Sequence, residues 1–127
     1  MDYSMAEFAL REVLRNKAEY AEVRLEATKT NGFIMKNGVP QLSGFDRTHG
    51  MGIKFLLNKT SGFLSTNSLE KHKIKQLVAS AIKTAKRASE ISEKIMYSPE
   101  KISRKSYNVK QRIKLQEFGS DKKLDLL

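Results

Sequence analysis

The residues from Tyr20 to Thr28 alternate strictly between apolar and polar, and this alternation constrains the fold more than any other feature of the chain. Glu22, Arg24 and Glu26 occupy one set of positions. The intervening apolar set is Ala21, Val23, Leu25 and Ala27. A period of two is that of a β-strand, whose successive side chains point to opposite faces. We therefore expect the apolar set to be buried and the charged set to face water or a polar partner.

Turn residues divide the stretch that follows into short strands. Thr30–Gly32 is expected to end the first strand, since glycine weakens a strand interior. Asn37-Gly38 lies between two short apolar runs, and both residues accept the positive φ that a tight hairpin turn requires. Pro40 has no N–H to donate, so the strand from Val39 to about Phe45 is expected to be an edge strand or to contain a bulge.

The segment "HGMGIKFLLNKTSGF", His49–Phe63, resembles a phosphate-binding loop at first sight. A dinucleotide-binding loop would carry a third glycine at the entry to a helix, but Phe55 stands there, and no Gly-Lys-Ser/Thr triplet is present. The alternation instead predicts a strand, "NKTSG" a turn, and Gly62–Thr66 the returning strand. Gly50 and Gly52 are expected to permit a sharp turn or a bulge where the chain enters the sheet. The apolar face of this strand comprises Met51, Ile53, Phe55 and Leu57.

Two segments have the three- and four-residue apolar spacing of amphipathic helices. The first is Ser4–Lys17, where Ser4 and Glu7 have the spacing of a capping box. The second is longer, and Asn67 and Glu70 have the equivalent spacing before it, with Thr66 and Ser68 as further capping candidates. Its apolar stripe comprises Ile74, Leu77, Val78, Ala81, Ile82, Ala85, Ala88 and Ile91.

These elements predict an α/β fold of the α+β type. We expect a mostly antiparallel sheet of about four to five strands, packed against an N-terminal helix and one long amphipathic helix. Beyond Pro99 the pattern is weaker, although "SDKKLDLL" after Gly119 has the features of a helix start. Tyr107, Val109, Ile113 and Leu115 suggest extended structure in between.

No residue pattern in the chain predicts a catalytic, cofactor-binding or metal-binding site. His49 and His72 are the two histidines, and neither belongs to a metal-binding motif such as H-E-x-x-H. Glu22 and Glu26 share one strand face, and paired carboxylates can act as acid and base, but Arg24 between them favours an exposed face of alternating charge. We assign no site residue.

The formal net charge is +10, and it is uneven. Residues 1–64 carry 9 basic and 7 acidic side chains, whereas residues 65–127 carry 15 and 7. Such a gradient is typical of a protein that binds a nucleic acid or an acidic partner. No aromatic and basic recognition motif accompanies it, however, which favours the interpretation that the lysines are simply exposed to solvent. The chain has no cysteine, no secretory signal and no apolar run of the ~20 residues that cross a bilayer. We expect a cytoplasmic protein without membrane contact.

The order and residues of these elements resemble the N-terminal domain of the TldD/PmbA family. The resemblance covers about residues 4–89 and is carried by four segments in order: "AEYAEVRLE", the turn at Gly38, the Gly-x-Gly-Ile-Lys segment from Gly50, and Gly62–Thr66 before the long helix. At Lys54 the family more often has arginine.

The resemblance implies a domain of residues 1–96, followed at 97–127 by a linker and the truncated start of a further domain. The family was named for modulation of DNA gyrase and contains zinc metallopeptidases, which work as homo- or heterodimers and whose N-terminal domains help enclose a peptide cleft. Their H-E-x-x-x-H motif lies in a later domain and is missing here. No catalytic residue can therefore be carried over, and zinc is implied only for complete members.

Our leading hypothesis is the non-catalytic N-terminal portion of a TldD/PmbA-type metallopeptidase, inactive alone. The sequence leaves open whether the chain is a natural truncation, a split subunit or an excised piece. The alternative from another class is a small basic module that binds nucleic acid, and a third reading is a remnant without function.

Overall fold

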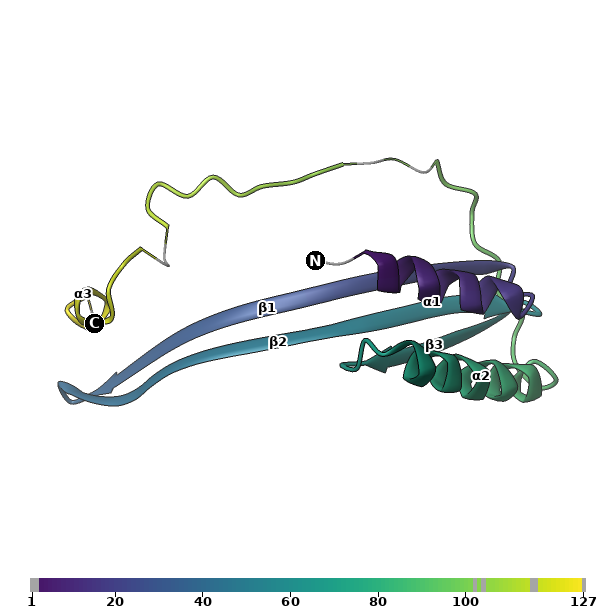
Figure 1. Cartoon of the computed structure of the whole chain (residues 1–127), viewed down its shortest axis with the longest axis horizontal. Coiled ribbons are helices and arrows are strands. Elements are labelled where there is room, and N and C mark those ends of the chain that lie inside the picture. The colour runs from purple at the N-terminus through teal and green to yellow at the C-terminus, as the bar shows by residue number, and fades with distance from the viewer. Residues whose placement is uncertain (1–2, 102, 104, 115–116, 127) are drawn as a thin grey trace. The chain divides into compact units, whose positions relative to one another are not determined.

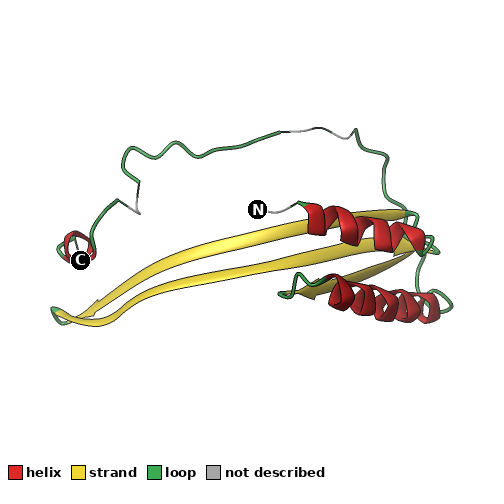
Figure 2. Cartoon of the chain, viewed as in Figure 1, coloured by secondary structure: helices red, strands yellow, loops and turns green. Residues whose placement is uncertain are grey.

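The computed structural model describes residues 3–101, 103, 105–114 and 117–126. Its helices and strands form an α+β fold, which confirms the expected fold class (Figures 1 and 2). In chain order the elements are α1 (Ser4–Arg15), β1 (Tyr20–Lys36), β2 (Val39–Leu57), β3 (Thr60–Thr66), α2 (Lys71–Ala88) and α3 (Ser120–Leu124).

The chain divides into two compact units, and both long strands pass from one to the other. Unit 1 consists of Met1–Thr28 and Thr48–Ser98, and unit 2 of Lys29–Arg47 and Pro99–Leu127. Unit 1 therefore holds both long helices and the three-stranded part of the sheet. Unit 2 holds the β1–β2 turn and α3.

The sheet has the strand order β1-β2-β3, and tight turns join the strands. Asn37 and Gly38 have φ of 51° and 73°, which confirms the predicted hairpin turn. Asn58 and Lys59 have φ of 50° and 59° and make the second turn, within the predicted "NKTSG" segment. The antiparallel register of β2 with β3 runs from Met51 opposite Thr66 to Leu57 opposite Thr60.

The expected strand segments are present, but several of them are joined. β1 continues through Thr30–Gly32, where the sequence predicted a break, and β2 continues through Gly44, Gly50 and Gly52 without the predicted sharp turn. The register of β2 with β3 has no bulge at Gly52. Glycine weakens a strand by roughly 0.5–1 kcal/mol, which a hydrogen-bonded neighbouring strand can outweigh. Pro40 lies where β2 extends beyond its pairing with β3, so its missing N–H costs no bond to β3.

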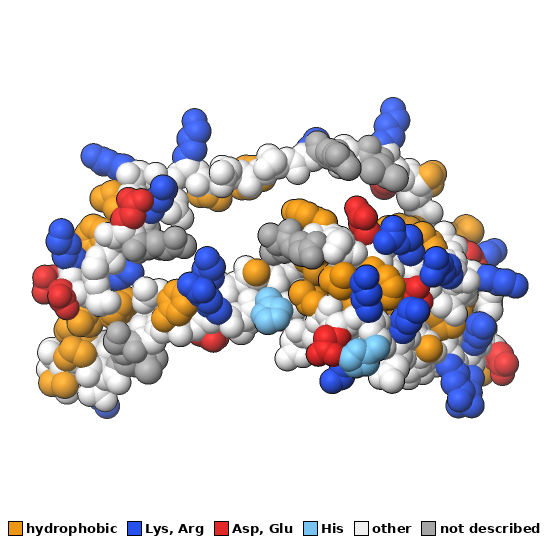
Figure 3. Space-filling model, in the orientation of Figure 1, with side chains coloured by type: hydrophobic (Ala, Val, Ile, Leu, Met, Phe, Trp, Pro, Cys, Tyr) orange, Lys and Arg blue, Asp and Glu red, His pale blue; other side chains and the backbone are white. Residues whose placement is uncertain are grey.

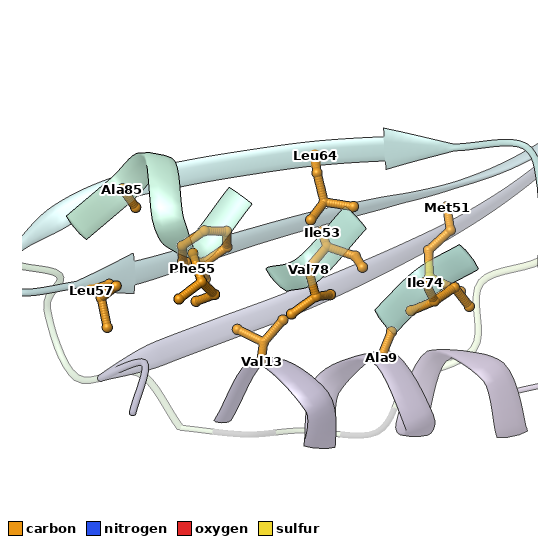
Figure 4. Packing of buried hydrophobic residues seen from close by; sticks show 11 residues of the cluster. Ala9, Val13, Met51, Ile53, Phe55, Leu57, Leu64, Ile74, Val78 and Ala85 are labelled. Carbon is orange, nitrogen blue, oxygen red and sulfur yellow. The ribbon is translucent and has the colours of Figure 1, made fainter. Parts of the chain in front are cut away.

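The core of unit 1 lies between one face of the sheet and the two long helices, α1 and α2. Figure 4 shows side chains from β2 and α2 pointing toward one another, with Ala9 and Val13 of α1 beside them. The predicted apolar face of β2 is confirmed. The buried residues of this cluster are Ala9, Val13, Met51, Ile53, Phe55, Leu57, Leu64, Ile74, Val78, Ile82 and Ala85.

Two ends of the predicted apolar patterns are solvent-exposed. On β1, Ala21, Val23 and Leu25 pack against the core on the predicted side but are only half-buried. Ala27 is exposed because it lies past the last β1 residue that packs on the cluster. On the α2 stripe, Ile91 is 91% exposed because the helix ends at Ala88.

The helix starts also differ from prediction. The N-cap residues are Tyr3 for α1 and Glu70 for α2, and neither makes a side-chain capping hydrogen bond. Ahead of α2, the Thr66 hydroxyl accepts a bond from the Ser68 N–H at 3.0 Å, so it orders the turn before the helix and not the helix itself.

The segment between α2 and α3 is largely irregular. The helix start predicted after Gly119 is confirmed as α3. Tyr107, Val109 and Ile113 are exposed and belong to no strand, while Leu115 is outside the described residues. None of the helices in the described part of the chain is long and apolar enough to cross a membrane.

Candidate functional site

The face of the unit 1 sheet opposite the helices carries a hollow of about 750 Å³. It exists because β2 presents Gly50 and Gly52 on this face, between the side chains of β1 and β3. We call it the glycine hollow. Its lining comprises Glu22, Arg24, Glu26 and Thr28 of β1, Thr48 to Gly52 and Lys54 of β2, Phe63, Ser65 and Thr66 of β3, and Asn67.

The two glycines form the floor of the glycine hollow. A Cβ atom on Gly52 would lie 3.5 Å from two ring carbons of Phe63, and one on Gly50 would lie 3.4 Å from the carbonyl oxygen of Thr66. The Phe63 ring thus covers the strand beside Gly52 while remaining 67% exposed itself. The glycines therefore shape a surface depression, a role that differs from the predicted turn or bulge.

The acidic residues that line the glycine hollow are already engaged by neighbours. Arg24 Nη2 lies 3.3 Å from Glu26 Oε2. The Tyr20 hydroxyl donates a hydrogen bond of 2.5 Å to Glu22, and this bond raises the pKa of Tyr20 above its ordinary value. The sequence interpretation, an exposed face of alternating charge, fits this arrangement better than an acid and base pair does.

The segment after α2 returns to the same sheet and covers its other end. The Ile95 N–H donates to the Lys59 carbonyl at 2.7 Å, which places Tyr97 on the sheet. The Tyr97 ring packs edge-on against Tyr20 at 4.9 Å, and Lys54 Nζ lies 4.9 Å from its centre. Tyr97 thus covers part of this sheet face beside Tyr20 and Lys54. Sequence reasoning missed it because no local pattern marks a residue that packs from beyond a helix.

The two histidines lie at separate places in unit 1. His49 lines the glycine hollow, and His72 lies in the first turn of α2 with Nδ1 3.4 Å from Glu70 Oε2. Among the described residues, no group of three or more His, Asp or Glu side chains could hold a metal ion. A catalytic zinc needs three protein ligands around an open position, so the described residues do not fit a zinc centre.

Comparison with known proteins shows which family this sequence matches. The sequence profile of the PmbA/TldA metallopeptidase domain 1 matches residues 21–92. A metalloprotease of Methanocaldococcus jannaschii is 31% identical over 85 residues, which are 65% of this chain and 18% of that protein. The chain therefore spans a small part of the length of this relative.

Two solved structures share the fold at low sequence identity. A candidate modulator of DNA gyrase from Bacteroides thetaiotaomicron aligns with a TM-score of 0.75 at 16% identity, over 96% of this chain and 28% of that one. TldE from Thermococcus kodakarensis aligns with a TM-score of 0.70 at 14% identity, over 93% and 26%. With the profile match covering more than half of its residues, the chain belongs to the PmbA/TldD metallopeptidase family and carries domain 1 of that family.

Proposed function

We propose that this chain serves as the non-catalytic first domain of a PmbA/TldD-type zinc metallopeptidase and hydrolyses no peptide by itself. The match to domain 1 carries this proposal. Two observations add support: the aligned part is 18% of the length of the metalloprotease relative, and the described residues do not fit a zinc centre. Hydrolysis would then depend on residues outside this chain.

The contribution of the domain, on this proposal, is a contact surface. The helices bury one face of the sheet and leave the glycine hollow on the other, bordered by the exposed Phe63 ring and the charged row of β1. An exposed aromatic ring among charged side chains is typical of a protein or peptide contact surface. The partners would be other family members in a homo- or heterodimer, with a peptide or protein substrate bound only in the complete assembly. Any effect on DNA gyrase would follow from processing by that assembly.

A peptidase assay on mixtures tests this role. The chain alone is expected to show no hydrolysis above buffer. Its addition to a full-length family member is expected to raise chelator-sensitive hydrolysis above that of the member alone. Hydrolysis unchanged by the added chain would contradict the partner role.

Two matched variants locate the contact within the same assay. Phe63→Ser removes the apolar wall of the glycine hollow, and Ile91→Ser removes an exposed apolar residue outside it. Both side chains are more than half exposed, so neither change is expected to unfold the chain. We expect Phe63→Ser to abolish the increase and Ile91→Ser to preserve it. Equal behaviour of the two variants would show that the contact lies elsewhere.

A further inference from the structure

Unit 2 carries most of the net positive charge of the chain in fewer than half of its residues. It contains eleven Lys and Arg residues against five Asp and Glu, a formal charge of +6 out of the total of +10. Figure 3 shows Lys and Arg side chains more often than Asp and Glu on the visible surface. Since the net charge of unit 2 is high for its size, an anionic partner would be attracted to it.

A second hollow, of about 740 Å³, lies within unit 2. We call it the basic hollow. Lys29 and Arg47 come from the two strands of the hairpin, and Lys114 comes from the segment before α3. Among the described residues that line it, none is a carboxylate, although Lys114 Nζ also lies 3.4 Å from Glu117 Oε1. Three cations without a lining acid form a site for a negatively charged ligand.

The other residues that line the basic hollow indicate which class of anion it would bind. The Arg47 guanidinium stacks 4.8 Å from the centre of the Phe45 ring, which is 58% exposed. Asn31, Asn108 and Gln111 add amide groups that both donate and accept hydrogen bonds. An exposed ring offers a stacking surface for a nucleobase, amides can pair with the edges of a base, and cations bind phosphates.

We propose that the basic hollow binds single-stranded nucleic acid, with a base stacked on Phe45 and phosphates bound by Lys29, Arg47 and Lys114. An acidic peptide would use the cations but not the aromatic ring. A duplex would keep its bases stacked inside and away from Phe45. The inference is independent of the proposed function, because it requires neither zinc nor a catalytic domain.

The sequence showed no aromatic and basic recognition motif because the two sides of the basic hollow are far apart in the chain. Phe45 and Arg47 are adjacent on one strand face, and this spacing was the only local signal. The residues opposite them, Asn108 to Lys114, carry the charge that the sequence interpretation assigned to solvated lysines.

Fluorescence anisotropy of a labelled oligothymidine of about twelve nucleotides tests the stacking contact. We expect Phe45→Leu in the full chain to weaken binding about tenfold, which is within the range for loss of one stacked base. Phe63→Leu removes another exposed ring, from unit 1, and is expected to leave the affinity within about twofold. Because both rings are exposed, thermal melting should be alike in the two variants. Equal affinities of the two variants would overturn the proposal.

The electrostatic contacts are tested by a second pair of variants that leave the fold unchanged. Lys29→Gln is expected to weaken binding. It is also expected to reduce the slope of log K against the logarithm of the salt concentration by about 0.7 in magnitude, the value for one phosphate of a single strand. Lys83→Gln removes an exposed charge from α2 and is expected to change neither. Equal losses of affinity in the two variants would show that binding depends only on the net charge of the chain, and would contradict a site in the basic hollow.

Competition distinguishes the class of ligand. Unlabelled oligothymidine is expected to displace the probe at much lower concentration than a polyglutamate of equal charge or a duplex of equal length. Displacement by polyglutamate at the same concentration as oligothymidine would show a general anion site and would contradict binding of a nucleobase.

Discussion

Replacing Ile74 by alanine is expected to lower the free energy of unfolding by about 2 to 5 kcal/mol. Ile74 is 0% exposed and lies on the buried face of α2, and Figure 4 shows it next to Met51 and Ala9. The change removes apolar contacts to β2 and α1 and leaves a cavity that the surrounding strands and helices can fill only in part. Urea unfolding followed by circular dichroism measures the difference.

Leu77→Ala is the matched control on the same helix. The sequence placed Leu77 in the same apolar stripe as Ile74. Truncation of a fully buried leucine to alanine costs about 2 to 5 kcal/mol. In the structure Leu77 is only half-buried, whereas Val78 beside it is buried. We therefore expect Leu77→Ala to cost about 1 kcal/mol. If Leu77→Ala were the more damaging of the two changes, the helix would face the sheet differently from the structure described above.

Gly62→Ala is expected to destabilise unit 1 by about 1 to 3 kcal/mol through overpacking. Gly62 pairs with Phe55 across β2 and β3, and the Phe55 ring lies over it. An alanine Cβ at this position would lie within 2.8 Å of three ring carbons, and Phe55 is 0% exposed. The ring or the strand must therefore shift. The unfolding free energy of the variant gives the cost directly.

Two comparisons separate this clash from a general effect of losing glycine. Gly32→Ala changes another strand glycine, whose added Cβ would have no atom within 4 Å, and is expected to be neutral. In a Phe55→Leu background the ring is gone, so Gly62→Ala should cost much less than it does in the original chain. A double-mutant cycle measures this coupling. A cost that is the same in both backgrounds would mean that the ring is not the cause.

The elements that depend on local patterns were predictable from the sequence. Alternation between Met51 and Leu57 predicted the buried face of β2, and Asn37-Gly38 predicted the hairpin turn, because side-chain period and positive φ are properties of neighbouring residues. The three- and four-residue spacing likewise predicted both long helices.

The extent of the strands and the helix starts were less predictable, because they depend on distant partners. Gly32 and Gly52 appeared to interrupt strands, yet a paired neighbour keeps the backbone extended there. Asn67 had the sequence of a cap, but α2 begins only after Glu70. For the strands, pairing with a neighbouring strand outweighed the local preference of glycine.

Neither hollow could be located from the sequence. The glycine hollow depends on the face that Gly50 and Gly52 share with Phe63 of the next strand, which alternation within a single strand does not specify. The basic hollow requires the hairpin and the segment around Val109 to meet, and the sequence carries no signal for that contact. The family resemblance, which rests on the order of the elements, was recognisable without either hollow.

The zinc content of the purified chain after exposure to zinc and exhaustive dialysis tests the central claim most directly. With only His49 and His72 as nitrogen ligands and no cysteine, the chain is expected to retain far less than one zinc per molecule. It is also expected to cleave no peptide in a parallel assay. Retention of one equivalent of zinc together with chelator-sensitive cleavage by the lone chain would contradict a non-catalytic first domain.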